Sequence, residues 1–82
     1  MNTRQEIINT LNAKIAAEFE LDEAIITPEA SIIETLDLDS ISLVDLISVV
    51  QQNFNVTIDK NELPSLKKME DLYDYIEAHQ KN

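Results

Sequence analysis

Apolar residues recur at helical spacing in three stretches of this 82-residue chain, and this periodicity limits the fold more than any other feature. The first stretch predicts an amphipathic helix over residues 3–19. Thr3 and Glu6 stand at its start with capping-box spacing, in which each side chain accepts a hydrogen bond from the other residue's backbone N–H. The apolar positions behind them share one face, which must be buried against other elements. They are Ile7, Ile8, Leu11, Ile15 and Phe19.

The second stretch predicts a helix over residues 40–54, with Asp39 as its N-cap. Its period and length favour a helix over a strand, although many of its residues are β-branched. Ile41 and Leu43 fall off the main stripe, so at least one of them should be partly exposed. We expect the inward stripe to consist of Val44, Ile47, Val50 and Phe54, broadened by Leu46 and Val49.

The third stretch predicts a last helix that Ser65 caps and that ends near His79. Before it, we expect one short helix at 59–63, because the cap spacing recurs there and Pro64 truncates the turn.

Residues 20–38 are predicted to form a long connection between the first two helices. Regularly placed apolar residues suggest that it is held against the core, with a short helical turn at 31–36. Thr27-Pro28 inside it is either a helix start or a simple turn.

These elements predict an all-α fold, a small bundle of three main helices plus one short helix, with the long loop between the first and second helices. The length fits a single domain over residues 1–82. A domain of this size buries only about 60% of its unfolded surface, which leaves little room for a catalytic cleft beside the core. We therefore expect a protein that is not an enzyme.

The formal net charge of −10, from 16 acidic and 6 basic residues, limits the partners. Nucleic acid and anionic membranes should repel the chain, whereas proteins with basic patches should be attracted to it. Without Cys there is no disulfide or thiolate metal site, and without Gly there is no glycine-rich phosphate loop. No apolar run reaches the ~20 residues of a membrane span. We expect a cytoplasmic monomer.

No catalytic or metal-binding residue is predicted. His79 is the only histidine, and its place near the C-terminus suits no Ser-His-Asp arrangement. Asp37 and Asp39 could open a calcium loop, but the later ligand positions of an EF-hand do not follow them.

Ser40 is the remaining candidate. It follows the cap residue Asp39, so its hydroxyl should lie in the first turn of a helix, where free N–H groups and the helix dipole would stabilise an attached anion. From position alone, an ordinary first-turn serine is the favoured interpretation.

The run Leu36-Asp37-Leu38-Asp39-Ser40-Ile41, followed by Leu43-Val44-Asp45-Leu46, resembles the signature of acyl carrier proteins. In that family an Asp-Ser-Leu step opens a helix that continues Val-Glu-Leu. The likeness covers nearly the whole chain, and it includes Phe54, Val56, Ile58, Leu66, Met69, Leu72, Tyr75, Ile76 and His79-Gln80.

The resemblance implies that a phosphopantetheinyl transferase, using magnesium, moves 4′-phosphopantetheine from coenzyme A onto Ser40. Asp39 would help to position the transferase and its metal. The thiol of the arm would then carry acyl groups as thioesters between enzymes of fatty acid, polyketide or specialised lipid biosynthesis.

The resemblance also implies two further groups of residues. The helix that starts at Ser40 would dock basic partner enzymes through Ile41 and Asp45, with Glu62 as an additional contact. The interior would shelter the acyl chain between residues that we expect to point inward: Val44, Leu46, Val50, Leu63, Leu66 and Ile76.

Three departures favour a specialised carrier over a housekeeping one. Asp37 replaces the family's Gly before the Asp-Ser pair, residues 48–53 carry no charge, and Pro64 interrupts the short helix. Two alternatives stay open: an aminoacyl or peptidyl carrier, such as a D-alanyl carrier, and an acidic helical interaction domain without a prosthetic group.

Overall fold

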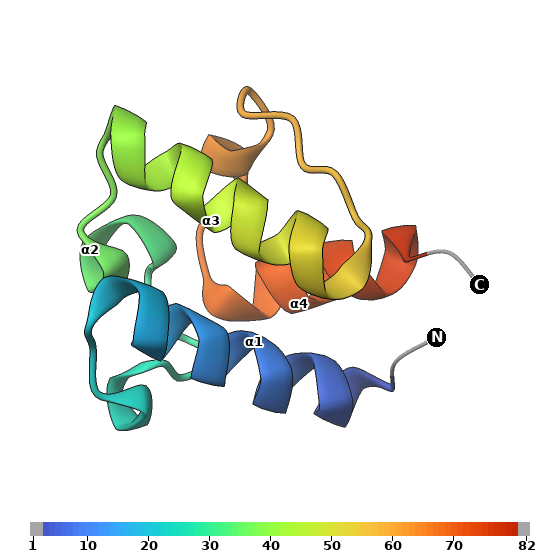
Figure 1. Cartoon of the computed structure of the whole chain (residues 1–82), viewed down its shortest axis with the longest axis horizontal. Coiled ribbons are helices and arrows are strands. Elements are labelled where there is room, and N and C mark those ends of the chain that lie inside the picture. Colours follow the sequence, from blue (N-terminus) through green and yellow to red (C-terminus); the bar gives the residue numbers. More distant parts are fainter. Residues whose placement is uncertain (1–2, 81–82) are drawn as a thin grey trace.

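The computed structural model describes residues 3–80 as a bundle of helices (Figure 1). Its elements are α1 (Arg4–Phe19), the 3-10 turn η1 (Glu23–Ile25), α2 (Ile32–Leu36), α3 (Ser40–Phe54), the 3-10 turn η2 (Leu63–Ser65) and α4 (Met69–His79). Both α3 and α4 contact α1 and run in the opposite direction to it (Figure 1). The expected all-α bundle with three main helices is confirmed.

The start of α1 has the predicted capping box. Thr3 Oγ1 accepts a hydrogen bond from the Glu6 N–H at 3.2 Å, and the Thr3 N–H donates to Glu6 Oε1 at 2.9 Å. The bond to Thr3 lowers the pKa of Glu6, because it stabilises the ionised carboxylate. From this cap, α1 buries Ile7, Leu11 and Ile15 completely.

The inward face of α3 differs from the predicted stripe. Val44 is 49% exposed, so its expected inward position is wrong. The buried side chains of α3 are Leu46, Val49, Val50 and Phe54. The prediction failed because α3 has apolar residues around most of its circumference, and periodicity alone did not fix which side faces the core. Ile41 is 74% exposed and Leu43 is half-buried, which confirms their expected place off the stripe.

The short helix expected at 59–63 is also wrong. Residues 60–62 form a turn instead, since Asp59 Oδ1 accepts a hydrogen bond from the Asn61 N–H at 2.8 Å and the Asp59 carbonyl accepts one from Glu62. The 3-10 turn η2 follows, and Pro64 lies within it rather than ending it. Proline is tolerated there, because the first N–H groups of a helical turn need no internal partner.

Ser65 does not cap the last helix, which begins four residues later at Met69. The reason is a pairing with the distant connection before α2. The Met69 N–H donates to the Ala30 carbonyl at 3.0 Å, and the Glu70 N–H donates to the Pro28 carbonyl at 2.9 Å. The first N–H groups of α4 are therefore satisfied by backbone from residues 28–30.

The long connection is held against the bundle, as expected, and α2 accounts for the predicted turn at 31–36. Thr27-Pro28 proves to be a simple turn, which the Ala30 N–H closes by donating to the Thr27 carbonyl. Asn12 of α1 donates to the Ile26 carbonyl at 3.2 Å and accepts from the buried Tyr73 hydroxyl of α4. Burial raises the pKa of Tyr73, and its hydroxyl therefore stays protonated at neutral pH.

One apolar core joins these elements. Val56 and Ile58 after α3 and Leu63 of η2 belong to it together with the main helices. Among residues 3–80 no charged side chain is buried in it, and the Tyr73 hydroxyl is bonded to Asn12. Within the same residues, no helix is long and apolar enough to cross a membrane.

Candidate functional site

Asp39 builds the first turn of α3. Its backbone is extended, and its Oδ1 accepts hydrogen bonds from the N–H groups of Ile41 at 3.0 Å and Ser42 at 2.8 Å. The bonds from Ser42 and then Ile41 lower the pKa of Asp39, because they stabilise the ionised form. The predicted N-cap is confirmed, and its carboxylate is charged at neutral pH.

Ser40 is the first residue of α3 and is exposed. Within residues 3–80, its hydroxyl forms no hydrogen bond, so it is open to a reagent that approaches from solvent. The expectation that free N–H groups here would hold an anion needs correction. Three of the first four N–H groups of α3 are already used, two by the Asp39 side chain and that of Leu43 by the Asp39 carbonyl. A phosphate on Ser40 would instead lie beside the Asp39 carboxylate.

Asp37 fixes how α2 leads into α3. It is the C-cap of α2, with φ 51° and ψ 52°, a left-handed conformation in which residues other than glycine are strained. Its N–H and that of Leu38 both donate to the Ile33 carbonyl. Because only three residues separate the two helices, Ser40 lies at the junction of α2 and α3 (Figure 1).

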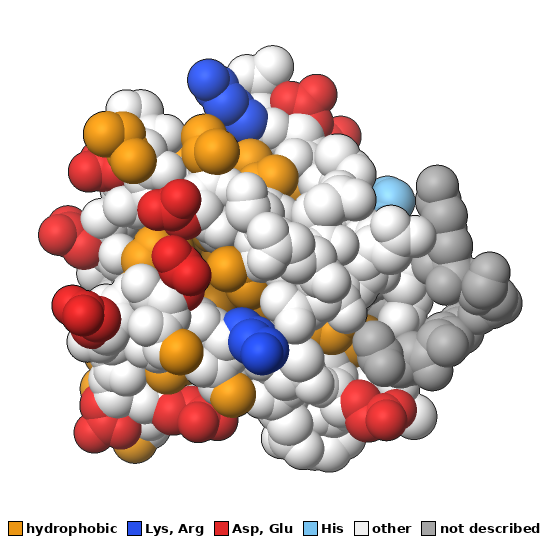
Figure 2. Space-filling view, in the orientation of Figure 1, with side chains coloured by type: hydrophobic (Ala, Val, Ile, Leu, Met, Phe, Trp, Pro, Cys, Tyr) orange, Lys and Arg blue, Asp and Glu red, His pale blue; other side chains and the backbone are white. Residues whose placement is uncertain are grey.

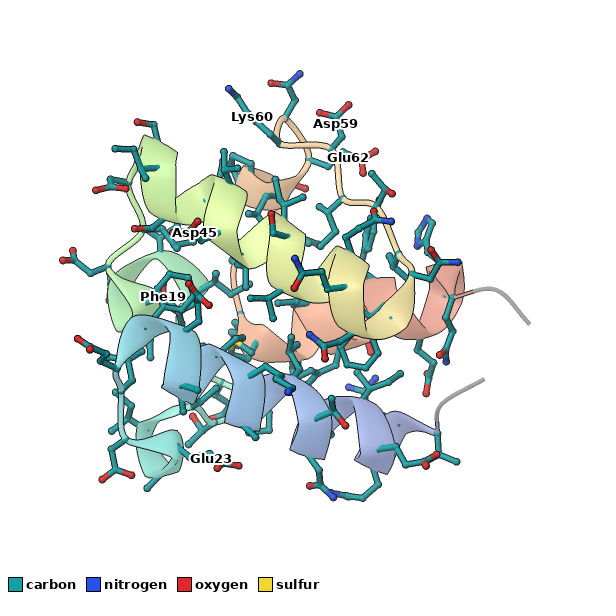
Figure 3. The ribbon with its side chains drawn as sticks, viewed as in Figure 1. Phe19, Glu23, Asp45, Asp59, Lys60 and Glu62 are labelled. Atoms are coloured by element: carbon teal, nitrogen blue, oxygen red, sulfur yellow. The ribbon has the colours of Figure 1, made fainter. Side chains whose placement is uncertain are left out.

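The three residues expected to dock partners do not all lie together. Ile41 and Asp45 are both exposed and stand four positions apart on α3, so they share a helix face next to Ser40. Glu62 lies elsewhere, in the loop with Asp59 and Lys60 (Figure 3). Its Oε2 accepts a hydrogen bond from the Tyr75 hydroxyl of α4 at 2.6 Å, and this bond raises the pKa of Tyr75.

Four of the six residues expected to line an acyl chain are buried, namely Leu46, Val50, Leu63 and Ile76. Leu66 is half-buried, and the exposed Val44 does not face the interior. A surface hollow of about 400 Å³ lies beside η2, lined by Ser65, Leu66, Asp71, Asp74 and Tyr75. It shares only Leu66 with the expected set.

Ile33 and Glu34 on α2 were not singled out from the sequence, yet both are exposed close to the α2–α3 junction. The signal was present, since Ile32 and Leu36 stand at i and i+4 and both are buried, which turns Ile33 outward. Among the described residues, no group of His, Asp and Glu side chains could hold a metal ion.

Comparison with known proteins assigns most of the chain to one family. Residues 9–76 match the sequence profile of a protein family described as "Phosphopantetheine attachment site". Several proteins named "Acyl carrier protein" are similar to the chain over most of their length. The one from Rubrobacter xylanophilus is 35% identical over 77 residues, which cover 94% of this chain and 95% of that protein. The one from Thermotoga maritima is 34% identical over 77 residues, with the same coverage. The one from Lactobacillus acidophilus is 35% identical over 78 residues, covering 95% and 98%.

Proposed function

The chain belongs to the acyl carrier protein family, and on that premise we propose that Ser40 carries its 4′-phosphopantetheine arm. As a member of this family the chain is a carrier with a covalently attached arm, and it serves as a substrate of partner enzymes rather than as a catalyst. The observation that carries the assignment is that Ser40, whose exposed hydroxyl forms no hydrogen bond within residues 3–80, is the first residue of α3 directly after its cap Asp39, inside the matched segment. When bound, the arm supplies the thiol that this chain, which contains no Cys, cannot provide.

The residues around Ser40 fit such a group. The Ser40 hydroxyl is exposed, and attachment forms a bond from Ser40 Oγ to the phosphorus of the arm while the diphosphate P–O bond of coenzyme A breaks, so that the hydroxyl proton and adenosine 3′,5′-bisphosphate leave. Because the N–H groups of Ile41 and Ser42 already donate to Asp39, the phosphate of the arm would gain no hydrogen bonds from them by folding back onto the start of α3. We expect it to project from the α2–α3 junction into solvent or into the active site of a partner.

Asp39 is proposed to have a second role besides capping. The two hydrogen bonds that Asp39 accepts from backbone N–H groups both use Oδ1, and the side chain is exposed. A carboxylate oxygen that is exposed and ionised is a suitable ligand for the magnesium ion that a phosphopantetheinyl transferase brings. Asp39 would thereby position the metal beside Ser40 Oγ.

The pathway is proposed to be a specialised one rather than housekeeping fatty acid synthesis. After Asp45, the rest of α3 carries no charge, and its exposed positions Ser48, Gln51 and Gln52 are neutral. Enzymes that recognise a charged second half of this helix would find no ion pairs there, so dedicated partners are favoured. The buried residues Leu46, Val50, Leu63 and Ile76 are proposed to line the space that an acyl chain would open between α3, η2 and α4.

Intact mass spectrometry tests the attachment site. The protein is incubated with coenzyme A, magnesium and a broad-specificity phosphopantetheinyl transferase, with Ser40→Ala in parallel. We expect the wild-type chain to gain one phosphopantetheinyl group and the variant to gain none. If the folded, unmodified wild-type chain gains no mass, or if Ser40→Ala still does, the proposal is wrong.

Two variants separate the roles proposed for Asp39. Asp39→Asn keeps a capping side chain but removes the charge, whereas Asp39→Ala removes both. We expect both variants to slow modification, with a raised requirement for magnesium, but only Asp39→Ala to lower the melting temperature, by about 4–8 °C. If Asp39→Asn is modified at the wild-type rate, Asp39 acts through the cap alone.

A further inference from the structure

The negative charge of the chain is concentrated in one part of the sequence. Residues 15–59 contain ten acidic residues and no basic residue, whereas the remaining residues contain six of each. The whole formal charge of −10 therefore comes from residues 15–59. Nine of these ten acids lie between Glu18 and Asp45. On the face in Figure 2, acidic side chains gather over α2 and the adjoining ends of α1 and α3.

The large exposed apolar side chains are found in the same part of the chain. Among residues 3–80 they are Ile25, Ile33, Ile41 and Val44, with exposures of 48%, 49%, 74% and 49%. Three of them lie on α2 or on the first turns of α3. Exposed apolar side chains rimmed by charge are typical of a protein interaction surface.

The acids near these apolar side chains are uncompensated. Within residues 3–80, the carboxylates of Glu34, Asp37 and Asp45 form no ion pair or hydrogen bond. At the other end of the molecule, Arg4 pairs with Asp74 at 2.6 Å and lies 3.9 Å from Glu77. The surface around the α2–α3 junction is thus complementary to a partner with basic and apolar side chains.

We infer that the phosphopantetheinyl transferase docks across the α2–α3 junction, with Ile33 and Glu34 of α2 as contacts in addition to Ile41 and Asp45 of α3. This inference rests on the proposed attachment at Ser40. An enzyme that modifies Ser40 must cover the junction where Ser40 lies. The four backbone steps from Leu36 to Ser40 span at most about 15 Å, and a typical interface of about 800 Å² per partner is wide enough to include both helices.

The second half of α3 and Glu62 lie outside the surface that we expect the transferase to contact, which we call its footprint. The second half of α3 has neutral exposed residues, and Glu62 is held by Tyr75 away from Asp45 (Figure 3). The contact surface therefore extends from Ser40 towards α2 rather than along α3.

Two matched pairs of variants test the footprint, with kcat/KM of the transferase measured by intact mass. Ile33→Ser is compared with Ile25→Ser, because both side chains are about half-exposed and η1 lies across the molecule from Ser40 (Figure 1). Glu34→Lys is compared with Glu23→Lys, which changes the net charge equally from a site on η1 (Figure 3). Melting curves identify any variant that loses its fold, and Ile33→Gln replaces Ile33→Ser if that variant does.

We expect Ile33→Ser to lower kcat/KM about tenfold and Glu34→Lys to lower it several-fold at low salt, with the effect of Glu34→Lys shrinking as salt is added. Both η1 variants should stay within about twofold of wild type. All variants should still reach full modification on long incubation.

Equal effects within each pair would overturn the inference. It would also be overturned if Ile33→Ser and Glu34→Lys were modified at the wild-type rate but lost a dimer that the wild-type chain forms on sedimentation, because the surface at the α2–α3 junction would then bind a second copy of the chain. Failure to modify any chain would instead reject the attachment at Ser40.

Discussion

Asp37 and Asp39 are the same residue type two positions apart, and the fold uses them in opposite ways. Asp39 has an extended backbone and caps α3 with its side chain, whereas Asp37 has a left-handed backbone and ends α2. The cap could be predicted from sequence, because a capping side chain and the helix it starts are adjacent. Asp37 stands where the acyl carrier signature of the sequence analysis has Gly, and its positive φ is a conformation that Gly adopts without a steric cost.

Asp37→Gly should stabilise the protein. Gly has no Cβ to clash in the left-handed region, and the substitution also removes one uncompensated acid. Asp37→Ala is the matched control, because it removes the same charge but keeps a Cβ. We expect the Gly variant to have a free energy of unfolding about 1 kcal/mol above that of the Ala variant, measured by urea denaturation. An Ala variant as stable as the Gly variant would show that the backbone at residue 37 relaxes without cost.

At the scale of elements, local signals predicted the two longest helices but were misleading in residues 59–65, where the cap spacing starts no helix at residue 59 and Ser65 caps none. The bounds of α1 and α3 follow from caps and periodicity, which reside in the helices themselves. The start of α4 was missed because Met69 and Glu70 find their hydrogen-bond acceptors in residues 28–30, about forty positions upstream. The site followed the same division: Ser40 and Asp39 belong to a local motif, whereas the separation of Glu62 from Asp45 depends on tertiary packing.

The amide groups at the start of α4 should be protected from hydrogen exchange. Glu70 is the second residue of α4 and donates to the Pro28 carbonyl, whereas Gln5 is the second residue of α1 and its N–H has no partner within residues 3–80. We expect the Glu70 amide to exchange at least about tenfold more slowly than the Gln5 amide, after correction for intrinsic rates, in NMR exchange experiments. Equal protection factors would mean that residues 28–30 detach from α4 in solution.

For the whole molecule, the uneven charge couples stability to recognition. The radius of gyration is 11.3 Å, close to the Debye length of about 10 Å at 0.1 M salt. Acids on α1, α2 and α3 therefore repel one another across the Ser40 end of the bundle at low ionic strength. The charge that should attract a basic partner there also destabilises the free protein, and binding of that partner would relieve the repulsion.

The melting temperature should therefore depend both on the salt concentration and on which acidic residue is neutralised. We expect it to rise as sodium chloride is increased from about 10 mM to 0.5 M, because the Debye length falls from about 30 Å to a few Å. Glu18→Gln and Glu77→Gln provide the positional test, since each removes one negative charge from the last turn of a helix. Glu18 has no partner within residues 3–80, whereas Glu77 lies 3.9 Å from Arg4.

At low salt, Glu18→Gln should raise the melting temperature, because it relieves repulsion and removes an acid from a helix C-terminus, where the dipole disfavours negative charge. Glu77→Gln should raise it less or lower it, since the same dipole gain is offset by the lost attraction to Arg4. The two variants should differ by no more than about 1 kcal/mol, and the difference should shrink in 0.5 M salt. If the difference between the two variants does not depend on salt, it comes from packing at these positions. If the wild-type melting temperature does not rise with salt, charge repulsion does not limit the stability of this fold.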